Sequence, residues 1–322
     1  MSQDTLLGTP AISSERVRGH LSLLRLDHSV KQLFVLPGIA VALVIGHVRP
    51  STHLLLQVLV GLLAVTAVAS SNYVLNELLD APFDRLHPSK CMRAAAQGLV
   101  HRPAAYLQWL MLAALGFALA GRVSRGVLLA SIALWLMGCI YNVAPIRSKD
   151  VPYLDVISEA INNPLRFCVG WYIVSSSIIP PVSLLIAYWM LGAYFMGLKR
   201  FSEYRQLGYE QAGWYRKSFL RYSEESLLNS IVFYAASAML FFGAFIMRYR
   251  MEMVLAFPVV ALLMAEYFKL SFEHDSAVQN PEKLFRERRL MVLLFICVAL
   301  LTCLLFVNVP LVSRMFPRSG TF

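Results

Sequence analysis

The amino-acid sequence predicts an all-α, polytopic membrane protein of about nine transmembrane helices. Three observations predict this fold class: an apolar composition, a series of long apolar segments, and an uneven distribution of Lys and Arg between those segments. The 322 residues are 58% hydrophobic and only 15% charged, with a mean hydropathy of +0.60. Since a soluble domain is usually about 45–50% apolar and about 25% charged, this composition indicates a chain that lies in a bilayer.

The apolar segments are long enough to cross a hydrocarbon layer about 30 Å thick. The segment 153–175 fits least well, because Asp155, Glu159, two asparagines and Arg166 interrupt it. The first 31 residues contain no long apolar run, so we expect the first segment to be a retained helix rather than a cleaved signal peptide. The predicted spans are 32–48, 54–78, 104–121, 126–144, 153–175, 181–198, 226–246, 251–270 and 290–308.

The segments between the spans indicate the orientation of the chain. With the N-terminus in the cytoplasm, the cytoplasmic segments hold about three times as many of the 29 Lys and Arg residues as the opposite side, as the positive-inside rule requires. We therefore expect residues 1–31 to form a cytoplasmic segment, 32–308 a single transmembrane domain that carries the site, and 309–322 an extracytoplasmic tail. This sorting explains the net charge of +10 without a nucleic-acid partner.

The five cysteines show no CxxC pair and no spacing typical of a metal site. Four of them lie in apolar runs, where cysteine behaves as a small hydrophobic residue. We interpret all five as structural.

Acidic residues are rare in membrane spans, so each one there is a candidate for function. Asn72, Asn76, Asp80 and Asp84 recur every four residues at the end of the second predicted span. A helix places such residues on one face, about 6 Å apart at each step. Their oxygens suit Mg²⁺, which binds through one or two carboxylates together with substrate phosphates. We predict Asn76, Asp80 and Asp84 as metal ligands, with Asp80 and Asp84 as the catalytic pair.

The residues that follow this helix suit phosphate groups. Lys90 could contact phosphate oxygens as a point charge and Arg93 as a planar fork. We expect Pro82 to break or kink the helix near its end, so that Asp84 lies on the turn that follows. The alternative is an ordinary helix end with solvated charges, which fits Glu77 but does not explain the four-residue spacing.

A second group of polar residues lies between positions 141 and 167. Its members Asp155, Glu159, Asn162 and Arg166 are spaced so that one continuous helix would place them on one face. The loop before them carries Arg147, Lys149 and Asp150. This group either binds substrate or metal directly, or forms a structural network inside the bundle in which Arg166 pairs with Glu159.

Further cations lie at the ends of two spans. Lys199 and Arg200 close the sixth span and belong either to the site or to a simple stop-transfer cluster. Lys31, at the start of the first span, has the same two interpretations. We interpret His28 and His87 as hydrogen-bonding loop residues rather than catalytic bases.

The motifs, taken in order, resemble those of a known family. NxxxDxxxD at Asn76, Asp80 and Asp84, followed by a basic loop and by YNxxPxRxKDxPxxD from Tyr141 to Asp155, resembles the UbiA superfamily of intramembrane prenyltransferases. The resemblance covers most of the chain, including the nine-span arrangement. It implies a UbiA-like helical bundle that encloses a cavity open laterally to lipid.

The segment NELLDAPFDRLHPSKCMR is similar to one branch of that superfamily, which makes decaprenylphosphoryl-5-phosphoribose. Ala94 departs from the branch pattern, which has proline there. This resemblance implies Mg²⁺-dependent transfer of 5-phosphoribosyl from phosphoribosyl pyrophosphate to a polyprenyl phosphate, which supplies a lipid-linked arabinofuranose precursor for glycans. The matching residues are Asn76, Asp80, Asp84, His87, Pro88, Lys90 and Arg93, followed by Lys199, Arg200 and Glu203 in a KRxxE element.

The acids alone do not identify the donor, because prenyl and phosphoribosyl transfer both expel pyrophosphate from a carbon that becomes cationic. The supply of cations favours the phosphate-rich pair of substrates. The alternatives are prenyl transfer to an aromatic acceptor, and a membrane transporter or scaffold. We expect the site to face the cytoplasm from a bacterial inner (plasma) membrane. The expected substrate-binding residues are Lys31, Asn72, Asn76, Lys90, Arg93, Tyr141, Arg147, Lys149, Asp155, Glu159, Arg166, Lys199 and Arg200.

Overall fold

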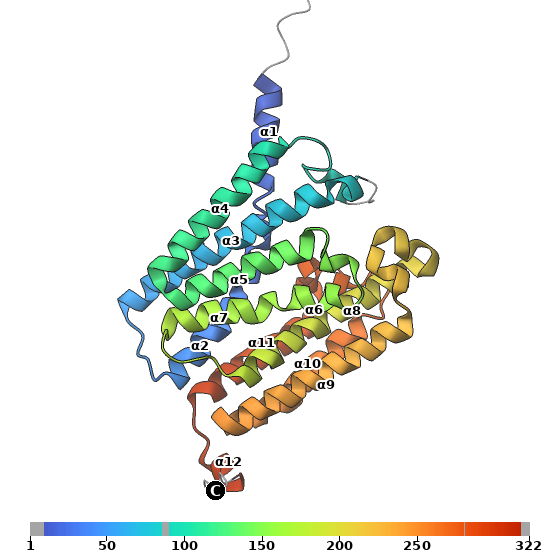
Figure 1. Ribbon diagram of the computed structural model, residues 1–322. Helices are drawn as coiled ribbons and strands as arrows, with labels where there is room; N and C mark the ends of the chain where they lie inside the picture. The colour runs from blue at the N-terminus through green and yellow to red at the C-terminus, as the bar shows by residue number, and fades with distance from the viewer. Residues whose placement is uncertain (1–9, 86–89, 280, 317–322) are drawn as a thin grey trace, which may run out of the picture. The chain divides into compact units, whose positions relative to one another are not determined.

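A computed structural model describes residues 10–85, 90–279 and 281–316 of the chain, and in these ranges it contains helices and no strand (Figure 1). The α-helices are α1 (Pro10–Ser22), α2 (Leu36–Ile45), α3 (Thr52–Asp84), α4 (Arg102–Val123), α5 (Arg125–Asn142), α6 (Leu154–Ala160), α7 (Asn162–Val174), α8 (Val182–Tyr215), α9 (Glu224–Tyr249), α10 (Phe257–Leu270), α11 (Arg288–Phe306) and α12 (Pro310–Met315). Short 3₁₀ helices are η1 (Leu26–Val35), η2 (Lys90–Met92), η3 (Ser148–Asp150), η4 (Lys217–Arg221), η5 (Met251–Ala256), η6 (Ala277–Gln279) and η7 (Pro281–Arg286).

The all-α membrane fold class is confirmed. Seven helical segments among the described residues are long and apolar enough to cross a bilayer. They coincide with seven of the predicted spans, and the count of nine stays a prediction. The seven are Thr52–Asp84, Arg102–Val123, Arg125–Asn142, Val182–Gly208, Glu224–Tyr249, Met251–Leu270 and Arg288–Phe306.

The two remaining predicted spans form shorter helices. The first corresponds to an apolar helical stretch over Ser29–Ile45, which consists of most of η1 followed directly by α2. The span predicted at 153–175 consists of two helices, α6 and α7, which are separated at Ile161. Pro164 accounts for the break, because it has no N–H to donate to the carbonyl of Ala160, whereas it is tolerated in the first turn of α7.

Contacts between residues divide the chain into two compact units. Unit 1 comprises residues 1–38, 50–148 and 165–176, and unit 2 comprises residues 39–49, 149–164 and 177–322. The prediction of a single transmembrane domain over 32–308 stays a prediction.

In unit 1, α3 packs along α4 and α5 (Figure 1). The buried side of α3 carries small residues such as Ala64 and Val68, which face Gly116 of α4. A Cβ at Gly116 would lie 3.0 Å from the carbonyl oxygen of Ala64. Small residues of this kind let helix backbones approach closely where lipid supplies no hydrophobic driving force, and they hold α3 firmly against its neighbours.

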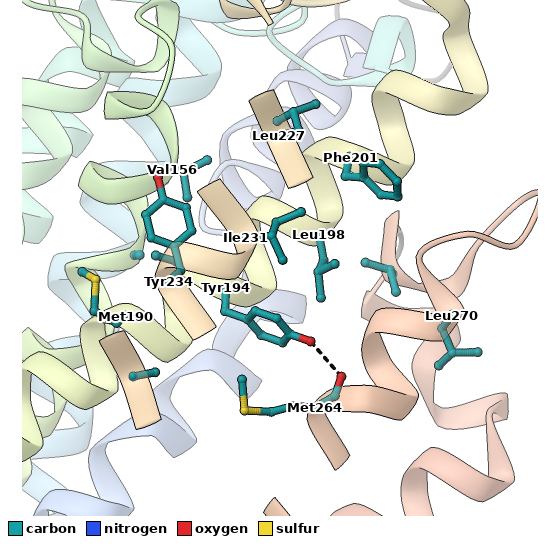
Figure 2. Close-up of a cluster of buried hydrophobic side chains, with 14 of the residues drawn as sticks. Val156, Met190, Tyr194, Leu198, Phe201, Leu227, Ile231, Tyr234, Met264 and Leu270 are labelled. Atoms are coloured by element: carbon teal, nitrogen blue, oxygen red, sulfur yellow. Dashed lines mark hydrogen bonds between the residues drawn. The ribbon is translucent and has the colours of Figure 1, made fainter. Parts of the chain in front are cut away.

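In unit 2, α8 packs along α9 and also contacts α6. A cluster of buried hydrophobic side chains fills this unit, and Figure 2 shows its centre around Tyr194, Leu198 and Ile231. The hydroxyl of Tyr194 donates a hydrogen bond of 2.8 Å to the backbone carbonyl of Met264, which ties α8 to α10. This core includes Leu198 and Phe201 of α8. It therefore fixes the turn of α8 that carries Lys199 and Arg200, which is the end of the sixth predicted span.

Candidate active site

The four residues of the predicted metal motif all lie on α3, one helical turn apart. The expectation that Asp84 lies on a turn after Pro82 is wrong, because α3 continues through Pro82 and Asp84 is its last residue. A proline in the last turn removes one hydrogen bond, but the N–H of Arg85 still reaches the carbonyl of Ala81 at 3.3 Å. Asp84 therefore keeps the helical spacing from Asp80.

The two asparagines of the motif bind α5. Nδ2 of Asn72 donates to the backbone carbonyl of Leu134 at 3.0 Å, and its Oδ1 is buried without a hydrogen-bond partner. Gly138 makes room for Asn72, because a Cβ there would overlap the side-chain amide. One turn further along, Nδ2 of Asn76 donates to Oδ1 of Asn142 at 2.6 Å.

The two aspartates of the motif each pair with an arginine of unit 1. Nη2 of Arg147 lies 2.9 Å from Oδ1 of Asp80, and Nη1 of Arg93 lies 2.8 Å from Oδ2 of Asp84. The side chain of Arg147 also lies over the ring of Phe83, at 5.3 Å from the centroid. Both pairs keep some contact with solvent, so a charged ligand could reach them.

The segment that carries Arg93 is fixed to α3 at two points. Oε1 of Glu77 accepts a hydrogen bond from the N–H of Ala95 at 3.4 Å, and Nε of Arg85 donates to the carbonyl of Ala96 at 2.9 Å. Glu77 is only 4% exposed, so the expectation that it is an ordinary solvated charge is wrong. Its burial follows from the segment 90–96 folding back over this turn of α3, which the spacing of α3 alone does not reveal.

The other predicted residues of unit 1 have varied surroundings. The ammonium of Lys31 lies 6.0 Å from the ring centroid of Tyr73. Nε of Arg166, which is buried, donates to Oε1 of buried Gln32 at 3.1 Å. Lys90 and Tyr141 are half-buried and make further contacts. The predicted residues His87 and Pro88 lie outside the described residues.

Unit 2 contains a buried ion cluster around Arg200. Its guanidinium reaches Oδ2 of Asp155 at 3.1 Å, Oε2 of Glu159 at 3.1 Å and Oε2 of Glu203 at 3.3 Å. The side chain of Arg200 is 2% exposed and that of Asp155 is 0% exposed. Lys199 adds a second cation, 4.0 Å from Glu203. Since three carboxylates surround Arg200, it primarily fixes the acids of α6 against α8.

Two further residues of this cluster lie on the segment after α8, and sequence reasoning missed both. The hydroxyl of Tyr222 donates to Oδ1 of Asp155 at 2.8 Å, and that of Ser218 donates to Oδ2 at 3.2 Å. Burial, together with the charge of Asp155, raises the pKa of Tyr222, so the phenol stays a donor. The backbone N–H of Tyr153 donates to the same phenol oxygen. No spacing links these residues along the sequence, so only the folded chain reveals them.

Lys149, which belongs to unit 2, is buried and has interacting partners. A cavity of about 380 Å³ lies in the same unit, with three aromatic rings and three small polar side chains in its wall. The residues that line it are Tyr153, Ile157, Ser226, Asn229, Ser230, Phe233 and Tyr234.

The α3 motif fits a hard divalent cation. Its three predicted ligands, Asn76, Asp80 and Asp84, offer one amide oxygen and two carboxylates, and oxygen is the ligand atom that Mg²⁺ prefers. Within the part of the chain that the structure describes, no three His, Cys, Asp or Glu side chains converge as a metal-binding group. Mg²⁺ usually takes few protein ligands and completes its coordination with water and substrate phosphates.

The fold and these groups define a class: a helical integral membrane protein with acids and paired arginines placed for phosphate chemistry. A family model of the UbiA prenyltransferase family matches residues 34–294, so the chain belongs to this family, and the predicted superfamily is confirmed. The members of this family are transferases, so the chain is an enzyme rather than a transporter or scaffold.

The chain is also similar to an uncharacterized protein, y4nM, of Sinorhizobium fredii (strain NBRC 101917 / NGR234), with 28% identity over 157 residues. The match spans 49% of this chain and 29% of that protein, so the chain matches less than a third of its curated relative.

Among solved structures, the chain resembles a UbiA homolog from Archaeoglobus fulgidus. The structure bound to DMAPP and Mg²⁺ has a TM-score of 0.67 at 23% identity, covering 90% of this chain and 99% of that chain. The structure bound to GPP and Mg²⁺ has a TM-score of 0.66 at 22% identity, covering 90% and 100%. At this identity the likeness concerns the fold.

Proposed function

We propose that the protein is a polyprenyl-phosphate phosphoribosyltransferase. In this proposal it moves 5-phosphoribosyl from phosphoribosyl pyrophosphate to a polyprenyl phosphate, with Mg²⁺ as cofactor. The product would be a lipid-linked arabinofuranose precursor for glycans. The site would face the cytoplasm from a bacterial inner membrane, as the distribution of Lys and Arg suggests.

The observation that carries the proposal is the pairing of each motif aspartate with its own arginine. Asp80 with Arg147 and Asp84 with Arg93 form two ion pairs with no net charge. Mg²⁺ at the aspartates would turn this group into one with a charge of about +2, and it would direct both guanidinium forks toward phosphate oxygens. A pyrophosphate fits that charge.

The ribose donor is favoured by the basic segment after α3. Lys90 and Arg93 match the branch pattern that acts on phosphoribosyl pyrophosphate, and Lys31 adds a cation in unit 1. Donor and acceptor together bring three phosphate-bearing groups, whereas a prenyl donor with an aromatic acceptor brings only the donor pyrophosphate. The surplus of cations therefore supports the phosphate-rich pair.

In the proposed reaction, an oxygen of the lipid phosphate forms a bond to C1 of the ribose. The bond from C1 to the pyrophosphate oxygen breaks, and its electron pair leaves with pyrophosphate. The acceptor is already anionic near neutral pH, so no strong general base is required. When bound, Mg²⁺ supplies charge stabilisation for the leaving group, while Arg93 and Arg147 hold phosphate oxygens in place.

The polar cluster of unit 2 has a supporting part in the proposal. Arg200 holds Asp155 and Glu159 in one buried arrangement. We retain Lys149 and Lys199 as substrate-binding residues, because both are cations close in sequence to members of this cluster. Lys149 lies shortly before Asp155, and Lys199 directly precedes Arg200.

The test is incubation of the purified protein with Mg²⁺, a polyprenyl phosphate and phosphoribosyl pyrophosphate labelled in the ribose. A labelled lipid that requires Mg²⁺ is the expected product. Absence of labelled lipid, together with transfer of a prenyl group to an aromatic acid, would overturn the proposal.

Prenyl transfer to an aromatic acceptor is the second candidate. The structures of the Archaeoglobus fulgidus homolog with DMAPP or GPP favour it. Aromatic rings in the wall of the unit 2 cavity, from Tyr153, Phe233 and Tyr234, also suit an aromatic acceptor. A thermal-shift experiment separates the two candidates. In the presence of Mg²⁺, micromolar phosphoribosyl pyrophosphate should raise the unfolding temperature of the protein, and micromolar geranyl diphosphate should not.

A further inference from the structure

Asn142, the last residue of α5, makes two side-chain hydrogen bonds in opposite directions. Its Nδ2 donates to the backbone carbonyl of Gly138 at 2.9 Å, and its Oδ1 accepts from Nδ2 of Asn76 at 2.6 Å. Its side chain is buried, at 3% exposed. Asn142 therefore connects the backbone of α5 to the amide residue of the proposed metal motif on α3.

The direction of this chain of hydrogen bonds is fixed by chemistry. A backbone carbonyl can only accept, so the end of the Asn142 amide next to Gly138 must be the NH₂ group. The other end of that amide is then oxygen, which requires a donor, and Asn76 must present its own NH₂ group. Oδ1 of Asn76 consequently faces away from Asn142, and it makes no hydrogen bond to any described residue.

We infer that Asn142 is a positioning residue, which holds the amide of Asn76 with its oxygen directed toward the cation site. The inference rests on the proposed Mg²⁺ site at Asn76, Asp80 and Asp84. Mg²⁺ binds the oxygen of an amide and not its NH₂ group. Without Asn142 the Asn76 amide can rotate by half a turn, and the rotated amide would offer a donor where the cation needs a lone pair.

The direct test is Asn142→Leu, which removes both hydrogen bonds at similar side-chain size. The measurement is the Mg²⁺ concentration that gives half-maximal thermal stabilisation of the purified protein in saturating inorganic pyrophosphate. We expect this concentration to rise about tenfold, as for other residues that orient metal ligands. Asn308→Leu is the matched control, because it also removes a hydrogen-bonded amide, at an exposed position after α11, and it should leave the midpoint unchanged.

A second background separates positioning from simple packing. Asn76→Asp replaces the amide by a carboxylate, which has oxygen at both ends and needs no orientation. In that background Asn142→Leu should shift the Mg²⁺ midpoint less than about twofold. An equal shift in both backgrounds would mean that Asn142 acts only through packing and would overturn the inference, because independent effects add.

Should Asn142→Leu fail to fold, Asn142→Ser serves in its place. A serine near the end of a helix can still donate to the carbonyl four residues before it, but it is too short to reach Asn76. The same tenfold weakening is expected, and an unchanged midpoint would overturn the inference. Since the probe is inorganic pyrophosphate, the result does not depend on the donor. A protein that transfers prenyl groups would contradict the proposed function and leave this inference standing.

Discussion

At the scale of single residues, the aspartates of α3 carry the first prediction. Asp80→Asn and Asp84→Asn each remove a charge that would hold the cation, while keeping the size of the side chain. We expect kcat to fall by about 10²–10³ in each variant, the range found when a group that stabilises transition-state charge is lost. The measurement is labelled-lipid formation at saturating Mg²⁺ and substrates.

The control is Glu252→Gln in unit 2, which removes a carboxylate that pairs with Arg250 and belongs neither to the α3 motif nor to the Arg200 cluster. Its turnover should match the wild type. Retained turnover in either aspartate variant would move the cation site away from α3.

Tyr222 carries the second residue-scale prediction. Tyr222→Phe leaves Oδ1 of buried Asp155 without its phenol donor, so we expect a loss of about 1–3 kcal/mol in stability. The folded pKa of Tyr222 is raised by burial, so the phenol contribution is fully present below its unfolded pKa of about 10 and is lost as the pH rises above it. Denaturation of the wild type and of Tyr222→Phe at pH 7 and pH 10.5 measures the difference in their free energies of unfolding at each pH.

The gap between the two proteins should narrow at the higher pH. A gap that stays constant would show that the phenol does not ionise on unfolding in this range. No gap at either pH would mean that the hydrogen bond to Asp155 contributes nothing to stability.

At the scale of elements, the approach of α5 to α3 depends on one glycine. A Cβ at Gly138 would overlap the amide of Asn72, so Gly138→Ala must displace either that side chain or α5. We expect a destabilisation of about 1–3 kcal/mol, the usual cost of overpacking. Thermal unfolding in detergent measures it.

Gly243 of α9 provides the matched control. A Cβ at this position meets nothing within 4 Å, so Gly243→Ala should be neutral or stabilise α9 by up to about 1 kcal/mol through helix propensity. Equal effects of the two substitutions would contradict the close contact at Gly138.

At the scale of the whole molecule, the orientation in the membrane is the feature to test. The positive-inside rule places the segment around Gln97 in the cytoplasm and that around His53 on the opposite side, and both side chains are exposed. In a background without native cysteines, His53→Cys should react with a membrane-impermeant maleimide in intact spheroplasts. Gln97→Cys should react only after lysis, and the reverse pattern would overturn the N-in orientation.

The fold class, seven of the spans and the family could be predicted from the sequence, because they depend on properties that are local or periodic. Apolar length reports a membrane span whatever its neighbours are. The four-residue spacing from Asn72 to Asp84 likewise reports a helical face, since it follows from the helix itself. The sequence was misleading where a local rule competed with its surroundings, as at Pro82, where α3 continues to Asp84.

The partners of the site residues could not be predicted from the sequence and are visible only in the folded chain. Asp80 meets Arg147 across 67 positions, Asp155 meets Tyr222 across 67, and Asn76 meets Asn142 across 66. No periodicity relates residues so far apart, because their contact depends on how whole helices pack. The inferred direction of the Asn76 amide depends on such contacts. The carbonyl of Gly138 on α5 orients the amide of Asn142, and Asn142 in turn orients the amide of Asn76 on α3.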